Sequence, residues 1–383
     1  MPLLTVSLLL SVSTMAQSSH PQGSKGQPRQ SKTSKVQKSH TQPTTSQTSK
    51  DLSAQGPTHQ NDEEAALWKV RVAPIVEGCT TDYQKARAIY DWVCQNIAYD
   101  MGKDIGDANT CWSQRRGICS GYSQLYIKLA QGCGLQAEEI NGMAKTLSFA
   151  NGSGPHAWVK VKTEKGWILL DATWGSGEVI TGQKGTKQYK HQYRSFWFDI
   201  DPKWNIFTHF PKEADDQLLP SPISQEQYQR LPIFWPSMGE WGLNADSTLA
   251  YCLAHKGAKM PKSYDVPQQA LGKMKLLEFP LSRTLQIGKS YRIVVETTDA
   301  NYRPFSQPQT EWKQEGNQYT TTFKPTAKQR FIRLEIGETD GKGGWNVFTI
   351  LEYAVEGKRW FCLPRATRCH AHNKRVSEKN NRD

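Results

Sequence analysis

Cys119 is the residue of this sequence best suited to nucleophilic chemistry. It lies between two glycines, Gly117 and Gly121, directly before an apolar pattern typical of a helix. A thiol at the start of a helix ionises more readily, because free backbone N–H groups and the helix dipole stabilise the thiolate. Arg115 and Arg116 add positive charge nearby. Taken alone, such a cysteine is more often a buried structural residue or half of a disulfide, so the interpretation as a nucleophile needs a base.

A predicted β-hairpin supplies that base and a carboxylate. Strand-like stretches at 156–162 and 167–173 flank a four-residue turn that starts at Thr163 and ends at Gly166. If these two residues pair, paired residue numbers sum to 329, and Asp171 lies on the same face as His156, one diagonal step away. A turn of odd length would put the two side chains on opposite faces. The sequence therefore predicts a hydrogen bond between His156 and Asp171.

Two helices and a further strand are expected to position these residues. An amphipathic stripe with helical spacing runs from Ala86 to Ile97, and Cys94 on that stripe is expected to be buried. A second helix is predicted from Cys119 to the Gly132-Cys133-Gly134 stop, and a strand over 140–147 precedes the hairpin.

Three motifs that contain these residues resemble, in order and spacing, those of the transglutaminase-like cysteine-enzyme superfamily. They are Gly117-Ile118-Cys119-Ser120-Gly121-Tyr122, Pro155-His156-Ala157-Trp158-Val159, and Leu170-Asp171-Ala172-Thr173-Trp174-Gly175-Ser176-Gly177. Further segments, among them Thr208-His209-Phe210-Pro211, are similar to the kyphoscoliosis-peptidase branch. The likeness covers roughly residues 80 to 235.

The resemblance implies a papain-like α+β core with a catalytic triad and no cofactor or metal. Cys119 would be the nucleophile, His156 the base, and Asp171 the residue that orients the imidazole. The oxyanion would be bound by the Cys119 backbone N–H and a nearby side chain, for which Gln114 is a candidate. Trp158, two residues after His156, and Trp174, three residues after Asp171, are expected either to lie in the core or to line the acyl groove.

The remaining sequence predicts several further segments. From about residue 274, apolar residues alternate in repeated short runs that indicate a small antiparallel β-sandwich, similar in character to the immunoglobulin-like extension of that branch. The predicted organisation is a signal peptide at 1–16, a disordered basic tether at 17–62, the catalytic domain at 63–235, a connector at 236–265, the β-sandwich module at 266–357 and a basic tail at 358–383.

Charge and apolar patterning exclude some classes of partner. The net charge of +12 comes mostly from the tether (+4) and from residues 356–383 (+5), which argues against specific nucleic-acid binding by the folded part. No uninterrupted apolar run reaches the 18 residues that a membrane span needs, so no transmembrane anchor is expected. The apolar start, which precedes small residues near Ala16, predicts an exported protein, although it lacks the usual early Lys or Arg.

The eight cysteines bear on pairing and on metal binding. If Cys119 is free, at least one more cysteine is unpaired or forms an intermolecular bridge in an oxidising compartment, and Cys362 with Cys369 is the predicted local bridge. These two residues, with His370 and His372, lack zinc-site spacing.

The sequence supports an exported cysteine-dependent amide hydrolase that acts on a protein or peptide through a thioester. The alternatives are a protein-glutamine amine transferase and a catalytically silent peptide-binding or adhesion protein on the same fold.

Overall fold

The computed structural model of the chain describes residues 57–145, 152–181, 185–255 and 260–356. The helices are α1 (Pro57–Val72), α2 (Asp82–Asn96), α3 (Ala108–Gln114), α4 (Cys119–Gly132), α5 (Ala172–Ser176), α6 (Pro202–Asn205), α7 (Gln225–Arg230) and α8 (Ala245–Ala254). Short 3-10 helices are η2 (Ser195–Trp197), η3 (Ala214–Gln217), η4 (Pro236–Met238) and η5 (Gln268–Ala270).

The strands of the first part of the chain are β1 (Ala98–Tyr99), β2 (Arg116–Gly117), β3 (Ala137–Lys145), β4 (Ser153–Thr163), β5 (Gly166–Leu170), β6 (Gly177–Thr181), β7 (Lys187–His191), β8 (Phe198–Ile200) and β9 (His209–Pro211). Those of the second part are β10 (Lys262–Ser263), β11 (Met274–Glu278), β12 (Thr284–Leu285), β13 (Tyr291–Thr297), β14 (Tyr302–Gln307), β15 (Lys313–Glu315), β16 (Gln318–Phe323), β17 (Phe331–Thr339) and β18 (Trp345–Val355).

A five-stranded antiparallel sheet forms the centre of the first part, with strand order β8-β5-β4-β3-β9. The predicted hairpin register is confirmed: Thr163 pairs with Gly166 and Val159 with Leu170, so paired numbers sum to 329. The predicted second strand is too long, because β5 ends at Leu170. Asp171 is instead the N-cap of helix α5, and its carboxylate accepts the Trp174 backbone N–H.

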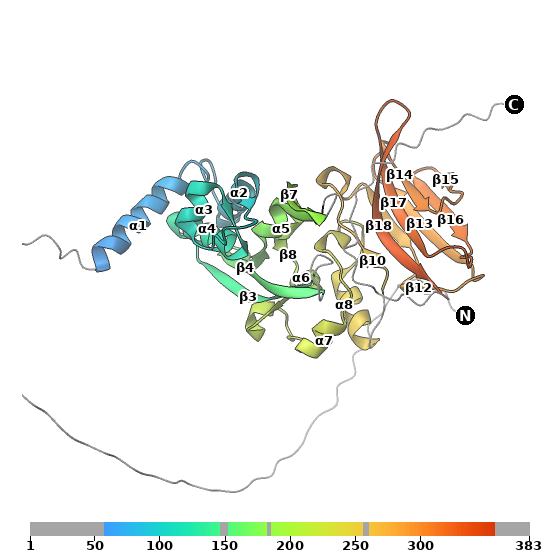
Figure 1. Cartoon of the computed structure of the whole chain (residues 1–383), viewed down its shortest axis with the longest axis horizontal. Helices are drawn as coiled ribbons and strands as arrows, with labels where there is room; N and C mark the ends of the chain where they lie inside the picture. Colours follow the sequence, from blue (N-terminus) through green and yellow to red (C-terminus); the bar gives the residue numbers. More distant parts are fainter. Residues whose placement is uncertain (1–56, 146–151, 182–184, 256–259, 357–383) are drawn as a thin grey trace, which may run out of the picture. The chain divides into compact units, whose positions relative to one another are not determined.

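Helices α2 and α4 pack against this sheet, as Figure 1 shows for α4 beside β3 and β4. The predicted stripe of α2 is confirmed, and Ala86, Ile89, Tyr90, Val93 and Cys94 are buried. A capping box at Thr81 fixes the start of α2 by satisfying backbone N–H groups that have no partner within the helix. Helix α4 begins and ends at the predicted residues.

Close backbone approach fixes the position of the first turn of α4. The Ile118 N–H donates to the Ile105 carbonyl at 2.9 Å. That same carbonyl lies so near Gly121 that any side chain there would clash with it. The glycine two residues after Cys119 therefore lets the preceding loop pack directly on the helix that starts with the thiol.

The C-terminal strands form two sheets, whose strands Figure 1 draws in orange. A four-stranded sheet has the order β11-β13-β16-β15, and a five-stranded sheet has the order β10-β18-β17-β14, with β12 parallel to β18. The alternating pattern correctly predicted β13, β16, β17 and β18. The immunoglobulin-like arrangement of these sheets stays a prediction.

Two predicted boundaries differ from the observed elements. Helix α1 begins at Pro57, inside the predicted tether 17–62, because its first turns are polar and carry no apolar stripe that a sequence pattern could detect. The predicted connector 236–265 contains α8 and strand β10, and β10 pairs with β18 of the C-terminal sheet. Two residues are enough for this ladder but too few for a recognisable alternation. The predicted signal peptide, the basic tail and the Cys362–Cys369 bridge lie outside the described residues.

The first part of the chain and the C-terminal part share direct contacts. The Ser195 backbone N–H donates to Gln268 Oε1 at 2.7 Å, and the Leu276 N–H donates to the Trp241 carbonyl at 2.8 Å. Arg194, which is buried, forms an ion pair with Asp265. Within the described ranges, no helix is both long and apolar enough to span a bilayer.

Candidate active site

Cys119 is the first residue of α4 and is half-buried. Ile118, the N-cap, offers no side-chain hydrogen bond to the helix. The first backbone N–H groups of an α-helix have no partner within the helix, so those around Cys119 are available to an anionic sulfur or to a substrate oxygen. The predicted position of the thiol at a helix mouth is thus confirmed.

His156 of β4 and Asp171, which caps α5, form a buried pair. His156 Nε2 lies 2.7 Å from Asp171 Oδ2, and both side chains are less than 5% exposed. The other carboxylate oxygen, Oδ1, accepts the Trp174 backbone N–H at 3.0 Å. The predicted contact therefore forms, although Asp171 reaches it from a helix cap and not from a strand.

The electrostatics couple these two residues to Cys119. Burial opposes the charge on His156, but the negative charge and hydrogen bond of Asp171 outweigh it and raise the pKa of the imidazole to about 9. Burial likewise disfavours the Cys119 thiolate, yet the hydrogen bond and charge of His156 and a backbone hydrogen bond from Ala157 lower the pKa of the thiol. The pKa of Asp171 is held well below its usual value by His156 and His209 despite burial. The three groups thus shift Cys119 toward the thiolate and His156 toward the imidazolium.

His209 is a member of this cluster that the sequence did not identify. It is fully buried on β9, and its Nε2 lies 3.1 Å from Asp171 Oδ2, the same oxygen that contacts His156. Its Nδ1 lies 2.9 Å from the Thr208 hydroxyl. The segment 208–211 contributed to the family resemblance, which was the only signal available, because β9 has three residues and lies 38 positions after Asp171.

Tryptophans surround the two imidazoles. The rings of Trp174, Trp158 and Trp197 lie 4.6, 4.9 and 5.4 Å from that of His209, and Trp235 lies 5.5 Å from Trp174. Trp158 and Trp197 are buried, which agrees with the core role considered for Trp158. Trp174 and Trp235 are half-buried, so they form the part of this wall that solvent or a substrate can touch.

Asp171 and its two partners, His156 and His209, carry atoms of the kinds that can ligate a metal. One ligand atom from each lies within 4.8 Å of the others. However, the 2.7 Å between His156 Nε2 and Asp171 Oδ2 is hydrogen-bond spacing, whereas two ligands of a tetrahedral zinc ion are about 3.3 Å apart. Both histidines also reach the same oxygen atom. The cluster therefore fits a proton network better than a metal.

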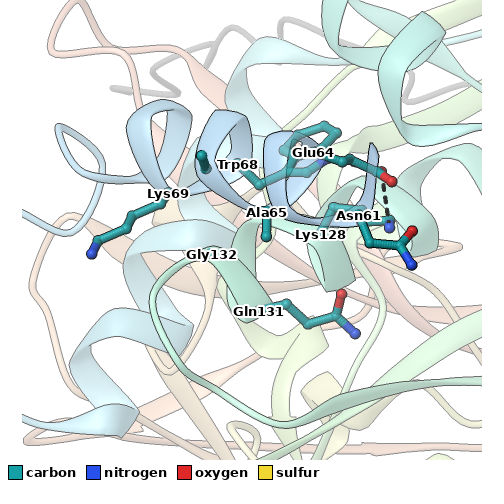
Figure 2. Close-up of a pocket in the computed structure, with 9 residues that line it drawn as sticks. Asn61, Glu64, Ala65, Trp68, Lys69, Lys128, Gln131 and Gly132 are labelled. Atoms are coloured by element: carbon teal, nitrogen blue, oxygen red, sulfur yellow. Dashed lines mark hydrogen bonds and ion pairs between the residues drawn. The ribbon is translucent and has the colours of Figure 1, made fainter. Parts of the chain in front are cut away.

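Two other features lie away from this chemistry. Gln114, the predicted oxyanion donor, is exposed at the end of α3. A pocket of about 460 Å³ lies between α1 and α4, where Glu64 pairs with Lys128 at 2.9 Å (Figure 2). Its lining includes Trp68, Lys69 and Gln131 but not Cys119, His156 or Asp171.

Comparison with known proteins gives the same family as the motifs. Residues 70–172 match the family model of the transglutaminase-like superfamily. The chain is 30% identical to human kyphoscoliosis peptidase over 169 residues, which are 41% of this chain and 25% of that protein. It is 26% identical to hillarin of Drosophila melanogaster over 190 residues, 45% of this chain and 23% of that protein.

Solved structures give a weaker likeness. A candidate cysteine protease from Cytophaga hutchinsonii is 24% identical, with a TM-score of 0.26, over 28% of this chain and 37% of that chain. A TM-score of this size does not by itself define the fold. The chain spans about a quarter of the length of the two relatives named above.

The matched region combines helices with an antiparallel sheet, as a transglutaminase-like fold does, and it contains Cys119, His156 and Asp171. Residues 70–172 of the chain therefore match the transglutaminase-like superfamily, and the same part of the chain is similar to kyphoscoliosis peptidase.

Proposed function

We propose that the chain is an exported cysteine-dependent amide hydrolase that uses Cys119, His156 and Asp171 on a protein or peptide substrate. The observation that carries this proposal is the buried 2.7 Å contact between His156 and Asp171, coupled to a thiol at the start of α4. A buried carboxylate that stabilises an imidazolium beside a thiolate is an arrangement that activates a cysteine nucleophile. The transglutaminase-like domain makes such an activity compatible with the family.

The proposed reaction uses both ring nitrogens of His156. Nε2 is held by Asp171, which leaves Nδ1 for proton exchange with Cys119 and the substrate. The Cys119 thiolate attacks the amide carbonyl, and the imidazolium donates its proton to the amine as the C–N bond breaks, which gives a thioester. Neutral His156 then takes a proton from water, the resulting hydroxide attacks the thioester, and the thiolate leaves.

Brief alkylation with iodoacetamide tests the central claim without a known substrate. We expect Cys119 to be modified fastest among the cysteines, and at a pH below that of a free thiol, because its pKa is lowered. Cys119→Ala should abolish this fast labelling. Cys133→Ala is the matched control, because Cys133 is also half-buried but burial raises the pKa of its thiol.

The opposite result would be equally clear. If peptide mapping finds Cys119 no more reactive than in the denatured chain, then the hydrolase proposal fails and a silent scaffold for peptide binding replaces it.

One observation favours the alternative reaction, transfer of the acyl group to an amine. The half-buried Trp174 and Trp235 extend the cluster of aromatic rings around the proposed triad. Such rings can exclude water, and an amine can compete with water for the thioester only where water is excluded. The segment 17–62 offers nine Gln and five Lys as internal substrates. We nevertheless favour hydrolysis, because water is abundant and two partly exposed rings do not enclose a channel.

Incubation of the purified protein, alone and with a primary-amine tag, separates the two reactions. Cys119-dependent cleavage or deamidation without the tag supports hydrolysis. Cys119-dependent tag incorporation or isopeptide ladders would replace hydrolysis with transamidation.

A further inference from the structure

We infer that His209 is a positioning residue of the active site: a second, neutral imidazole that holds the Asp171 carboxylate against His156. This inference rests on the proposed function, because it assigns a role within the same triad. His209 is fully buried, so it has no route to a substrate. Its influence on the reaction must pass through Asp171.

The first argument is the geometry of one oxygen atom. Asp171 Oδ2 lies 2.7 Å from His156 Nε2 and 3.1 Å from His209 Nε2, and Oδ1 accepts the Trp174 N–H at 3.0 Å. Both carboxylate oxygens thus have a partner besides His156. A carboxylate held at both oxygens cannot rotate about its Cβ–Cγ bond without breaking a buried hydrogen bond. His209 and Trp174 together fix the plane in which Asp171 meets His156.

The second argument is the protonation state of His209. An ionised Asp171 only accepts hydrogen bonds, so His209 Nε2 must carry a proton toward it. Burial lowers the pKa of His209 to about 4, so the ring is neutral at pH 7 and its Nδ1 has no proton. The Thr208 hydroxyl lies 2.9 Å from Nδ1 and 3.3 Å from the Asn205 carbonyl, and it donates its one proton to Nδ1, the nearer acceptor. Thr208 therefore selects the tautomer in which His209 donates to Asp171.

The third argument is the construction of the sheet. Strand β3 separates β4 from β9, and Gly142 of β3 pairs with His156 while Ala144 pairs with His209. Residues two apart on a strand share a face, so both imidazoles lie on one side of the sheet, with ring centres 5.3 Å apart. A Cβ at Gly142 would lie 2.8 Å from the Trp158 ring, which packs against both histidines. The small residues of β3 make room for this cluster.

A neutral donor suits the proposed task. A charged partner at this distance would compete with the imidazolium of His156 for the charge of Asp171. The neutral His209 satisfies the second acceptor site of Oδ2 without adding a positive charge, and it leaves the ion pair between Asp171 and His156 intact. The expected consequence is that a larger fraction of Cys119 is in the thiolate form at neutral pH than in a variant that lacks the His209 donor.

Replacement of His209 by Gln and by Met in the full chain tests this role. Gln can place an amide N–H close to the position of Nε2, whereas Met has a similar length but no donor. If His209 positions Asp171, Cys119 in the Met variant should be alkylated about threefold more slowly than in wild type at pH 6.5. The acid limb of the pH profile, where the alkylation rate rises as the thiol ionises, should move up by about half a pH unit. The Gln variant should stay close to wild type.

A role in packing alone predicts the reverse order. An apolar Met should then preserve the protein better than a buried Gln, and the pH profile of alkylation should not move while the melting temperature does. Either a reversed order of the two variants or an unchanged profile would overturn the inference. A downward shift of the limb in the Met variant would also overturn it, since His209 would then be withdrawing charge from Asp171.

A milder substitution keeps the test decisive if the His209 variants do not fold. Thr208→Val removes the hydroxyl that selects the tautomer but retains the shape of the side chain, and it should move the acid limb in the same direction by a smaller amount. Thr321→Val is the matched control, because it removes another buried threonine hydroxyl, in the C-terminal sheets. An unshifted limb in Thr208→Val would contradict the inference.

The measurements also separate this inference from the proposed function. If wild-type Cys119 is not activated, the hydrolase proposal itself fails. If Cys119 is activated and the His209 and Thr208 variants alkylate as wild type does, the hydrolase proposal stands and the role of His209 is disproved.

Discussion

The central sheet and the C-terminal sheets bury very different side chains. One face of the central sheet buries His156, Asp171 and His209, and the end of β3 buries Lys145. Among the described residues from 266 to 356, the buried side chains are two threonines, two tyrosines (Tyr302 and Tyr353) and otherwise apolar residues. Burial of a charge is costly unless partners offset it. We therefore place the proposed chemistry at the central sheet, while the buried side chains of the C-terminal strands pack mainly against one another.

Lys145 illustrates how the central sheet accommodates such groups. Its ammonium donates to the backbone carbonyls of Tyr228 and Leu231, with the Tyr228 ring 3.9 Å from Nζ. Burial lowers the pKa of this lysine to about 8. Backbone carbonyls offset the cost of burying a positive charge less well than a carboxylate does, so the pKa of Lys145 falls. The partner of His156 is the carboxylate of Asp171, and there the pKa rises.

The largest effect that would test this contrast is expected for Asp171→Asn. The amide should favour the wrong tautomer of His156, so turnover should fall by about 10³- to 10⁴-fold. The fold should persist with a stability loss far smaller than the loss of turnover, because Asn gives up the charge but is also a good N-cap for α5 and can still accept the Trp174 N–H. Turnover of a generic protein substrate and a thermal melt measure the two quantities.

Asp171→Ala is the matched comparison for this variant. It removes the cap as well as the charge, and it should cost about 1 kcal/mol more stability than Asn. If the melting temperature of the Asn variant collapsed in proportion to its activity, Asp171 would be a structural residue and the contrast between the sheets would disappear.

The second prediction addresses the C-terminal sheets. Leu334 lies fully buried on β17, so Leu334→Ala should lower the free energy of unfolding by about 2 to 5 kcal/mol. Below the melting transition, the pH dependence of Cys119 alkylation should match that of wild type. A denaturant titration and the alkylation assay check both statements, and a shifted alkylation profile would show that the C-terminal core tunes the active site.

The third prediction concerns pH. The imidazolium of His156 should persist to about pH 9, and turnover should fall above that value as the proton is lost. Because the folded-state pKa is raised from 6.5, this group also adds stability below about pH 6.5 that is lost progressively as the pH rises to about 9. A pH–rate profile with its alkaline limb near 7 would contradict the coupling between His156 and Asp171.

Sequence patterns were sufficient for the local parts of the site. The turn from Thr163 to Gly166 has an even number of residues, which correctly predicted that Asp171 lies on the same side as His156. The helical spacing of apolar residues correctly predicted that α4 starts at Cys119. Both inferences depend on residues close together in the chain. The end of β5 was missed because the capping preference of Asp171 competes with the apolar alternation around it.

The missing parts of the site arise from contacts between distant residues. His209 reaches Asp171 only because β9 pairs with β3, and Trp235 reaches Trp174 across about sixty positions of the chain. A three-residue strand carries no measurable period, and one tryptophan gives no spacing. Such positions can be found from a sequence only after the topology of the sheet is known.

The smallest effect is expected for Gln114→Ala, which tests whether an exposed side chain takes part in the site. Gln114 ends α3 with its side chain in solvent, and Arg115 then adopts a left-handed conformation before the chain reaches Cys119. The loss of a real oxyanion donor costs about 10²- to 10³-fold in turnover, whereas we expect a change of less than about twofold here. The free N–H groups at the start of α4 would then be the donors. Gln131→Ala, another exposed glutamine, is the control, and a drop of more than about tenfold in Gln114→Ala alone would show that Gln114 turns inward when substrate binds.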